Sequence, residues 1–323
     1  MKRLSSGWSR LKKGRSPSRN RERTPTLSRG PSSTGGLFPD GLKVLYASPN
    51  AVVDICFVHG LAGGRESTWT APGQSAPWLA TLLPDALPDV RILAHGYDAY
   101  LEHSSAVSSN NLGDHARNLI NDLATDREDS RVERPIVFVA HGLGGLVCKE
   151  GILQSSESGE PHLNAISVAT KAILFLGTPH LGSWTSDWAG IPARDLGIAT
   201  TTDLPLLEVL QSTSEFLESI HDRFMGMIRR RARDQALDVA CFYEELPLPG
   251  TNIRVVSKAS AAFPGFSPIS IHAHHLDMVK FQSAEDTGFK RVLGVLTRWC
   301  KDVKSAHREA FLVQRGSLGT SPC

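Results

Sequence analysis

Short apolar stretches rich in β-branched residues alternate along the chain with longer stretches in which apolar residues return every three or four positions. The short stretches predict strands buried on both faces, because such strands are apolar at nearly every position. They lie at 43–47, 52–58, 90–96, 136–140, 171–176, 239–243 and 253–257. The longer stretches predict amphipathic helices, at 112–124, 143–153, 206–228 and 286–300. This alternation predicts an α/β protein, with a mostly parallel central sheet and helices on both faces.

The two ends of the chain lack this alternation. Residues 1–39 are rich in Ser, Arg, Pro and Gly and bury too little apolar surface to offset the entropy of ordering, so we expect a disordered basic arm. Residues 40–302 form the predicted folded domain, and residues 303–323 are expected to be a tail. No apolar run approaches the roughly eighteen residues that a membrane-spanning helix needs. We therefore expect any membrane contact to be peripheral or through the arm.

The formal charge of +2 conceals an uneven distribution. Residues 1–30 hold ten Lys or Arg against one Glu, which leaves 25 basic and 32 acidic residues in the rest of the chain. An Arg- and Ser-rich, acid-poor segment is typical of a mitochondrial presequence. Leu4, Trp8 and Leu11 also recur at a helical spacing that suits an anionic membrane surface. A plain disordered tail with Ser-Pro phosphorylation sites is the other interpretation of the arm.

Cysteine and glycine patterns exclude several kinds of site. The five cysteines are odd in number and widely spaced, without a CxxC pair, which predicts reduced thiols in an intracellular protein and no metal site. No GxxxxGK[ST] phosphate-binding loop is present, so we expect no nucleotide or other cofactor. The basic run at 229–233 ends a predicted helix, where cations complement the helix dipole. We prefer that interpretation to nucleic-acid binding.

Polar and glycine-rich segments come directly after several predicted strands. Parallel strands bring their carboxyl ends to one edge of a sheet, where the sites of α/β proteins gather. The segments are HGLAGG at 59–64, HGLGG at 141–145, GTPHLGS at 177–183, Glu-Glu at 244–245 and His-His-Leu-Asp at 274–277. A nucleophile position, then an acid, then a histidine is the chain order of the α/β-hydrolases.

Six stretches together carry a family resemblance over about residues 53–282: VHGLAGGRESTW, RILAHGYDA, FVAHGLGGLVCKEGIL, AILFLGTPHLGS, CFYEELP and HAHHLDMVKF. They resemble the lipase-like serine esterase domains related to the serine-active-site-containing protein family and to the inositol-deacylase type of lipase. Similar domains precede nucleotide-binding domains in fungal receptor-like proteins. The resemblance implies an α/β-hydrolase fold, a lipid or acyl-ester ligand and a nucleotide-binding receptor-type partner. It also implies a location at mitochondrial or endoplasmic-reticulum membranes, with the cytoplasm as the alternative.

The resemblance also implies a role for individual positions. The family's nucleophile falls on Gly142, its acid on Glu244 and its base on His275. The backbone N–H groups that would hold the oxyanion fall on Leu61 and Leu143. Because Glu245 and His274 are adjacent to the acid and the base, they remain alternatives for those two roles.

Gly142 departs from the family pattern, because the nucleophile position should be serine. Glycine has no side chain, so neither a nucleophile nor an acyl-enzyme can form there. The centre of such a turn has unfavourable dihedral angles, which glycine tolerates better than serine. We therefore expect a catalytically impaired pseudo-hydrolase that acts in lipid or acyl binding or in regulation. The alternative is an active carboxylic ester hydrolase that uses a water activated by His275 and Glu244, or an atypical nucleophile at Cys148 or Ser183.

Four aromatic side chains near the predicted site have less specific interpretations. His59 and His141 flank the site, where we expect them to shape the turns by hydrogen bonding. Trp69 and Trp78 either line an acyl pocket or pack at the surface.

Overall fold

The computed structural model describes residues 40–61, 63–97, 112–128, 134–180, 214–231 and 236–318. Within these ranges seven strands form one sheet in the order β1-β3-β2-β4-β5-β6-β7. Strand β1 runs antiparallel to β3, and every other neighbouring pair is parallel. The strands are β1 (Gly41–Ala47), β2 (Val53–Val58), β3 (Val90–Gly96), β4 (Ile136–His141), β5 (Thr170–Leu176), β6 (Asp238–Glu244) and β7 (Ile269–Ile271).

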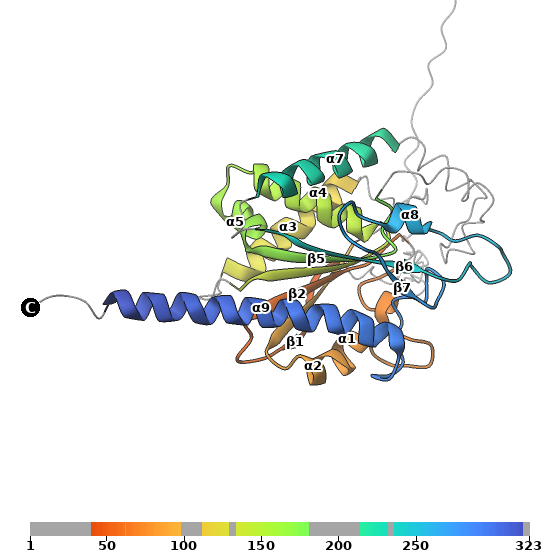
Figure 1. Ribbon diagram of the computed structural model, residues 1–323, viewed down its shortest axis with the longest axis horizontal. Helices are drawn as coiled ribbons and strands as arrows, with labels where there is room; N and C mark the ends of the chain where they lie inside the picture. The colour runs from red at the N-terminus through yellow and green to blue at the C-terminus, as the bar shows by residue number, and fades with distance from the viewer. Residues whose placement is uncertain are drawn as a thin grey trace, which may run out of the picture. The chain divides into compact units, whose positions relative to one another are not determined.

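Helices cover both faces of this sheet (Figure 1). One face carries α3 (Leu112–Glu128), α4 (Gly144–Glu157), α5 (Pro161–Ala169) and α7 (Ser214–Arg230). The other carries α1 (Trp78–Thr81), α2 (Leu83–Ala86) and α9 (Thr287–Leu318), and the short α8 (Lys258–Ala261) lies near the carboxyl end of β6. Every residue of β2 and β4 is buried, which is the reason for their unbroken apolar sequences. Two separate apolar clusters fill the layers above and below the sheet.

A mostly parallel sheet with helices on both faces, and a central strand–sharp turn–helix unit formed by β4 and α4, is the α/β-hydrolase fold. The sequence predicted this fold. In the described part of the chain, no helix combines the length and the apolar character that crossing a bilayer requires.

Two predicted elements are wrong. Residues 253–257 are not a strand: Val255 and Val256 are buried, but the Val256 N–H donates to a side-chain oxygen of Glu244 rather than to a sheet ladder. The last strand is instead β7, which is only three residues long and has Ser270 at its centre, so its apolar pattern is too short to be recognised. The final helix does not end at 300, because α9 runs to Leu318.

The extent of α9 also changes the expectation for the tail. Residues 303–318 are helical, and Lys304 in this stretch pairs with Asp89 at 2.8 Å.

The predicted helix over 206–228 is described from Ser214 onward as α7, and its first part lies outside the described residues. The basic arm of residues 1–39 also lies outside them, so its disorder stays a prediction.

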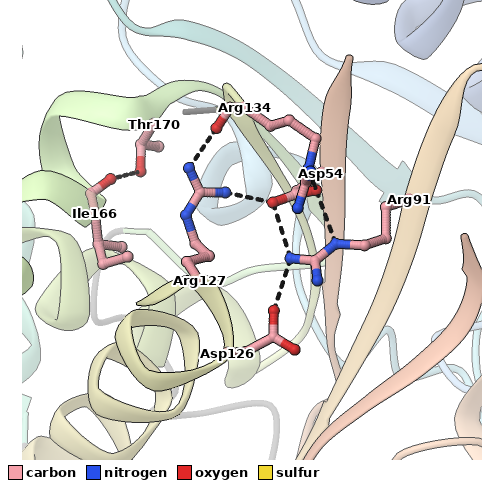
Figure 2. Close-up of polar contacts among 7 residues, drawn as sticks. All are labelled: Asp54, Arg91, Asp126, Arg127, Arg134, Ile166 and Thr170. Carbon is pink, nitrogen blue, oxygen red and sulfur yellow. Dashed lines mark hydrogen bonds and ion pairs between the residues drawn. The ribbon is translucent and has the colours of Figure 1, made fainter. Parts of the chain in front are cut away.

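A cluster of buried ion pairs connects the amino-terminal ends of the central strands (Figure 2). Asp54, at the start of β2, has no exposed surface and accepts from Arg91 at 3.0 Å, Arg134 at 2.6 Å and Arg127. Arg91 also pairs with Asp126 of α3 at 2.7 Å. The three guanidinium groups compensate the buried carboxylate, and together they connect β2, β3, α3 and the segment that enters β4. This cluster lies at the edge of the sheet opposite to the carboxyl ends of the parallel strands.

A second buried charged residue lies between α4 and α7. Lys149 has no exposed surface, and its Nζ donates to Nδ1 of His221 at 3.3 Å. Burial lowers the pKa of Lys149 to about 7. The amine also lies 5.3 to 5.8 Å from the centroids of three aromatic rings, those of Phe175, Phe224 and Phe263.

Candidate active site

The turn between β4 and α4 requires glycine at several positions. Gly142 has a φ of +51°, and its N–H donates to the Leu176 carbonyl of β5 at 2.9 Å. A Cβ on Gly144 would collide with the His59 carbonyl, and one on Gly145 would collide with the Thr178 side chain. The glycines thus give a left-handed turn and a close approach of the helix start to the neighbouring strand ends, which is the geometry of a nucleophile elbow.

Glu244 and His275 form a buried pair beside this turn. Glu244 is the last residue of β6, and its Oε2 accepts from His275 Nδ1 at 2.7 Å. Its Oε1 accepts from the Val256 N–H at 2.9 Å, so both carboxylate oxygens are held. Because Nδ1 carries the proton toward the carboxylate, Nε2 of His275 is left to face Gly142. An ideal Cβ at Gly142 would lie 3.2 Å from that Nε2.

The neighbouring glutamate and histidine make different contacts. Glu245 pairs with His272 Nδ1 at 2.8 Å, on the surface. His274 pairs with Asp277 at 2.9 Å, three residues along the same loop. Of the candidates that the sequence left open, Glu244 and His275 are the ones that the structure brings together with position 142.

Gly177 is a site residue that the sequence interpretation missed. It follows β5 with a φ of +58°, and a Cβ there would lie 2.9 Å from both Cε1 and Nδ1 of the His275 ring. The His275 ring therefore lies between two left-handed glycines, Gly142 and Gly177, at the ends of adjacent strands. The available signal was the glycine that directly follows a buried strand in GTPH.

His141 holds the loop that carries His275. Its Nε2–H donates to the His275 carbonyl at 3.1 Å, and the two rings lie 4.6 Å apart. Burial lowers the pKa of His141 well below its ordinary value, so the ring is neutral. This agrees with the expectation that His141 shapes a turn by hydrogen bonding.

The two predicted oxyanion positions lie on segments next to the turn. Leu143 directly follows Gly142 and precedes the first residue of α4. Leu61 follows Gly60, whose ideal Cβ would lie 3.0 Å from the His141 carbonyl and 3.6 Å from the Gly142 Cα. Their role in holding an oxyanion stays a prediction.

The structure gives little support to the substitute nucleophiles. Cys148 is fully buried in the apolar cluster, and burial raises the pKa of its thiol well above the ordinary value, so it is not a thiolate. Ser183 lies outside the described residues. Trp69 and Trp78 are buried core residues rather than surface residues, and both rings pack against Phe57. Among the described residues, no group of His, Cys, Asp or Glu is placed to hold a metal ion.

The chain matches no established family profile. It is similar to Protein SERAC1 of Danio rerio, with 27% identity over 282 residues that cover 79% of this chain and 41% of the relative. The Homo sapiens Protein SERAC1 is 26% identical over 283 residues, with the same coverage of both chains. The chain thus spans about two fifths of the length of the curated relatives it matches.

Solved structures with a similar outline include esterases and thioesterases. The NocB thioesterase domain, in a covalent complex with a fluorophosphonate nocardicin G analog, covers 80% of this chain and 98% of its own, with a TM-score of 0.43 and 13% identity. The mouse alpha/beta hydrolase domain-containing protein 10 covers 81% of this chain and 94% of its own, with a TM-score of 0.40 and 11% identity. The fold assignment itself rests on the sheet order and the turn at Gly142.

Proposed function

We propose that this protein is an esterase- or lipase-like α/β-hydrolase that has lost its nucleophile and acts by binding or regulation rather than by turnover. The observation that carries the proposal is the Glu244–His275 pair, hydrogen-bonded at 2.7 Å and directed at a residue without a side chain, Gly142. An acyl-enzyme needs a nucleophilic atom within hydrogen-bond reach of the base. The arrangement of His275 and Glu244 supports their assignment as base and acid, and Gly142 supplies no such atom.

Restoring the nucleophile tests the proposal. Ester hydrolysis and labelling by a fluorophosphonate are measured for the native chain, for Gly142→Ser, and for Gly142→Ser combined with His275→Ala. We expect labelling and turnover only in Gly142→Ser, because its hydroxyl would lie beside His275 Nε2. Labelling of the native chain, or labelling of Gly142→Ser that survives His275→Ala, would contradict the proposal.

A slow hydrolase is the second candidate function. The observation in its favour is that Nε2 of His275 faces Gly142, which has no side chain to take the place of an activated water. Hydrolases without one member of the triad retain roughly 10³- to 10⁴-fold acceleration over water. Turnover by the native chain that disappears with His275→Ala alone would favour this function over the first.

The proposal extends to a ligand, a partner and a location. The similarity to Protein SERAC1 supports kinship with the serine-active-site-containing family and, with it, a lipid or acyl-ester ligand. We also propose a nucleotide-binding receptor-type protein as partner, as in fungal proteins that carry such a domain. The basic arm supports peripheral contact with mitochondrial or endoplasmic-reticulum membranes. A fluorescent fusion of residues 1–39 that stays diffuse in the cytoplasm would contradict targeting by the arm.

A further inference from the structure

Lys149 is a buried amine in the interface between two helices, α4 and α7. Figure 1 shows α7 lying along α4, on the same face of the sheet. The side chain of Lys149 has no exposed surface, and its Nζ donates to Nδ1 of His221, on α7, at 3.3 Å. Among the described residues, no carboxylate pairs with this amine. The only polar group that α7 offers to Lys149 is therefore a neutral imidazole nitrogen.

Three titratable groups face Lys149, and all three are neutral near pH 7. His221 belongs to α7, His180 follows β5, and Cys241 belongs to β6. Burial lowers the pKa of His221 to about 4 and that of His180 well below its ordinary value. Burial also raises the pKa of the Cys241 thiol to about 12. The other neighbours are three phenylalanine rings, so no negative charge compensates a proton on Lys149.

A proton on Lys149 is therefore unfavourable while α7 is in place. Aromatic rings and one imidazole replace only part of the hydration that an ammonium group loses on burial. For this reason burial lowers the pKa of Lys149 to about 7. Contact with water would restore the ordinary affinity of the amine for a proton.

The attachment of α7 differs along its length. At the carboxyl end, the Arg231 guanidinium donates to the Thr170 carbonyl of β5 at 3.1 Å. Nearer the middle, Arg223 pairs with Glu150 of α4 at 3.2 Å, and partly exposed ion pairs of this kind contribute little to stability. The contact with Lys149 lies closer still to the amino end. That part of α7 can therefore separate from α4 while the carboxyl end stays attached.

We propose that Lys149 and His221 form a pH-dependent latch, which holds α7 on α4 while Lys149 is neutral and releases the amino-terminal part of α7 when Lys149 takes up a proton. Release brings the amine into water and uncovers Ile220 and Phe224 of α7, which are buried in the closed form. No step needs a nucleophile at position 142, so the latch does not depend on the proposed function.

The size of the pH dependence follows from the protons taken up on opening. The pKa of Lys149 is about 7 in the closed form and should return to 10.5 in the open form. From pH 8 to pH 6, this difference increases the population of the open form about tenfold. The pKa of His221 should also return from about 4 to 6.5, which adds a factor of about four at pH 6. The total increase is about 10- to 40-fold.

Amide hydrogen exchange of the full chain at pH 6, 7 and 8, followed by mass spectrometry, tests the latch. Division by the intrinsic exchange rate at each pH gives a protection factor, which reports opening alone when closing is faster than exchange. Peptides from α7 report the latch, and peptides from α9, on the other face of the sheet, report global unfolding. Lys149→Met removes the buried amine, and Lys301→Met removes an exposed lysine of α9 as the matched control.

We expect α7 to be less protected than α9 at every pH, because its opening is local. In the native chain and in Lys301→Met, the protection factors of α7 should fall about 10- to 40-fold from pH 8 to pH 6. In Lys149→Met the fall should be about fourfold at most, from His221 alone. In His221→Gln, which keeps an acceptor for the amine, a fall of about tenfold should remain.

Three results would overturn the latch. Equal protection of α7 and α9 at each pH would mean that α7 opens only when the whole domain unfolds. A change of less than about threefold in α7 of the native chain would mean that proton uptake by Lys149 does not drive release. A fall in Lys149→Met as large as in the native chain would assign the pH dependence to another group. If Lys149→Met does not fold, the native chain and His221→Gln still decide between these outcomes.

Discussion

Alanine in place of Gly142 is expected to destabilise the protein. Gly142 has a φ of +51°, a left-handed conformation that costs a residue with a Cβ roughly 1–2 kcal/mol. The new Cβ would also lie 3.2 Å from Nε2 of His275, inside ordinary van der Waals distance, so the ring or the turn has to shift. We expect a total loss of about 1–3 kcal/mol in the free energy of unfolding. For a domain of this size, that corresponds to a fall in Tm of roughly 2–12 °C.

The assay is urea and thermal unfolding of the full chain, with two matched glycine-to-alanine controls. Gly73 has a φ of +79° and nothing within 4 Å of an ideal Cβ, so Gly73→Ala measures backbone strain without crowding. Gly159 has no such φ and also nothing within 4 Å, so Gly159→Ala should leave Tm nearly unchanged. The expected order of destabilisation is Gly142, then Gly73, then Gly159.

The double variant Gly142→Ala with His275→Ala separates the two contributions at the site. Removing the His275 ring removes the crowding and leaves the backbone strain, so alanine at 142 should cost less in that background. An unchanged or raised Tm for Gly142→Ala, together with a destabilised Gly73→Ala, would refute the reasoning. Position 142 would then not occupy a left-handed elbow.

Three further predictions concern other buried groups. Asp54→Asn should cost about 3–5 kcal/mol in urea unfolding, because three guanidinium groups lose their shared carboxylate; a loss below about 1 kcal/mol would contradict the role of the cluster. Burial lowers the pKa of Lys149 from 10.5 to about 7, so the folded protein binds fewer protons than the unfolded chain between these pH values, and stability should rise with pH across that window. Lys149→Met should be more stable than the native chain at pH 7 and should lose that rise, and equal pH slopes in unfolding experiments on the two proteins would count against this account. Gly177→Ala would place a Cβ 2.9 Å from the His275 ring, so it should abolish fluorophosphonate labelling of the Gly142→Ser variant; undiminished labelling would mean that the ring does not need this space.

The sequence predicted most of the secondary structure because the sheet is covered on both faces. The strand predicted at 90–96 has the same bounds in the structure, and those predicted at 136–140 and 171–176 differ from β4 and β5 by one residue. The prediction failed where apolar residues are buried without belonging to a strand, and where a strand is too short to show a pattern. Val255 and Val256 are buried in a loop, and the three residues of β7 are too few to form a pattern.

The sequence left the acid and the base of the candidate site open by one residue each, and this ambiguity has a physical reason. Successive side chains at the end of a strand point in opposite directions, so Glu244 and Glu245 have similar sequence surroundings and opposite environments. The register of β6 and the course of the loop after β7 place Glu244 against His275 and leave Glu245 on the surface with His272. Neither property can be read from the chain alone.

The sequence by itself determined the alternating α/β pattern, the glycine turn and the absence of a nucleophile at Gly142, because each is a property of local residue types. Only the tertiary structure decided which acid meets which base and why Gly177 must lack a side chain. It also brought Asp54 together with arginines 37, 73 and 80 residues away in the chain. These contacts join groups far apart in sequence, and their partners are chosen by the packing of the sheet and its helices.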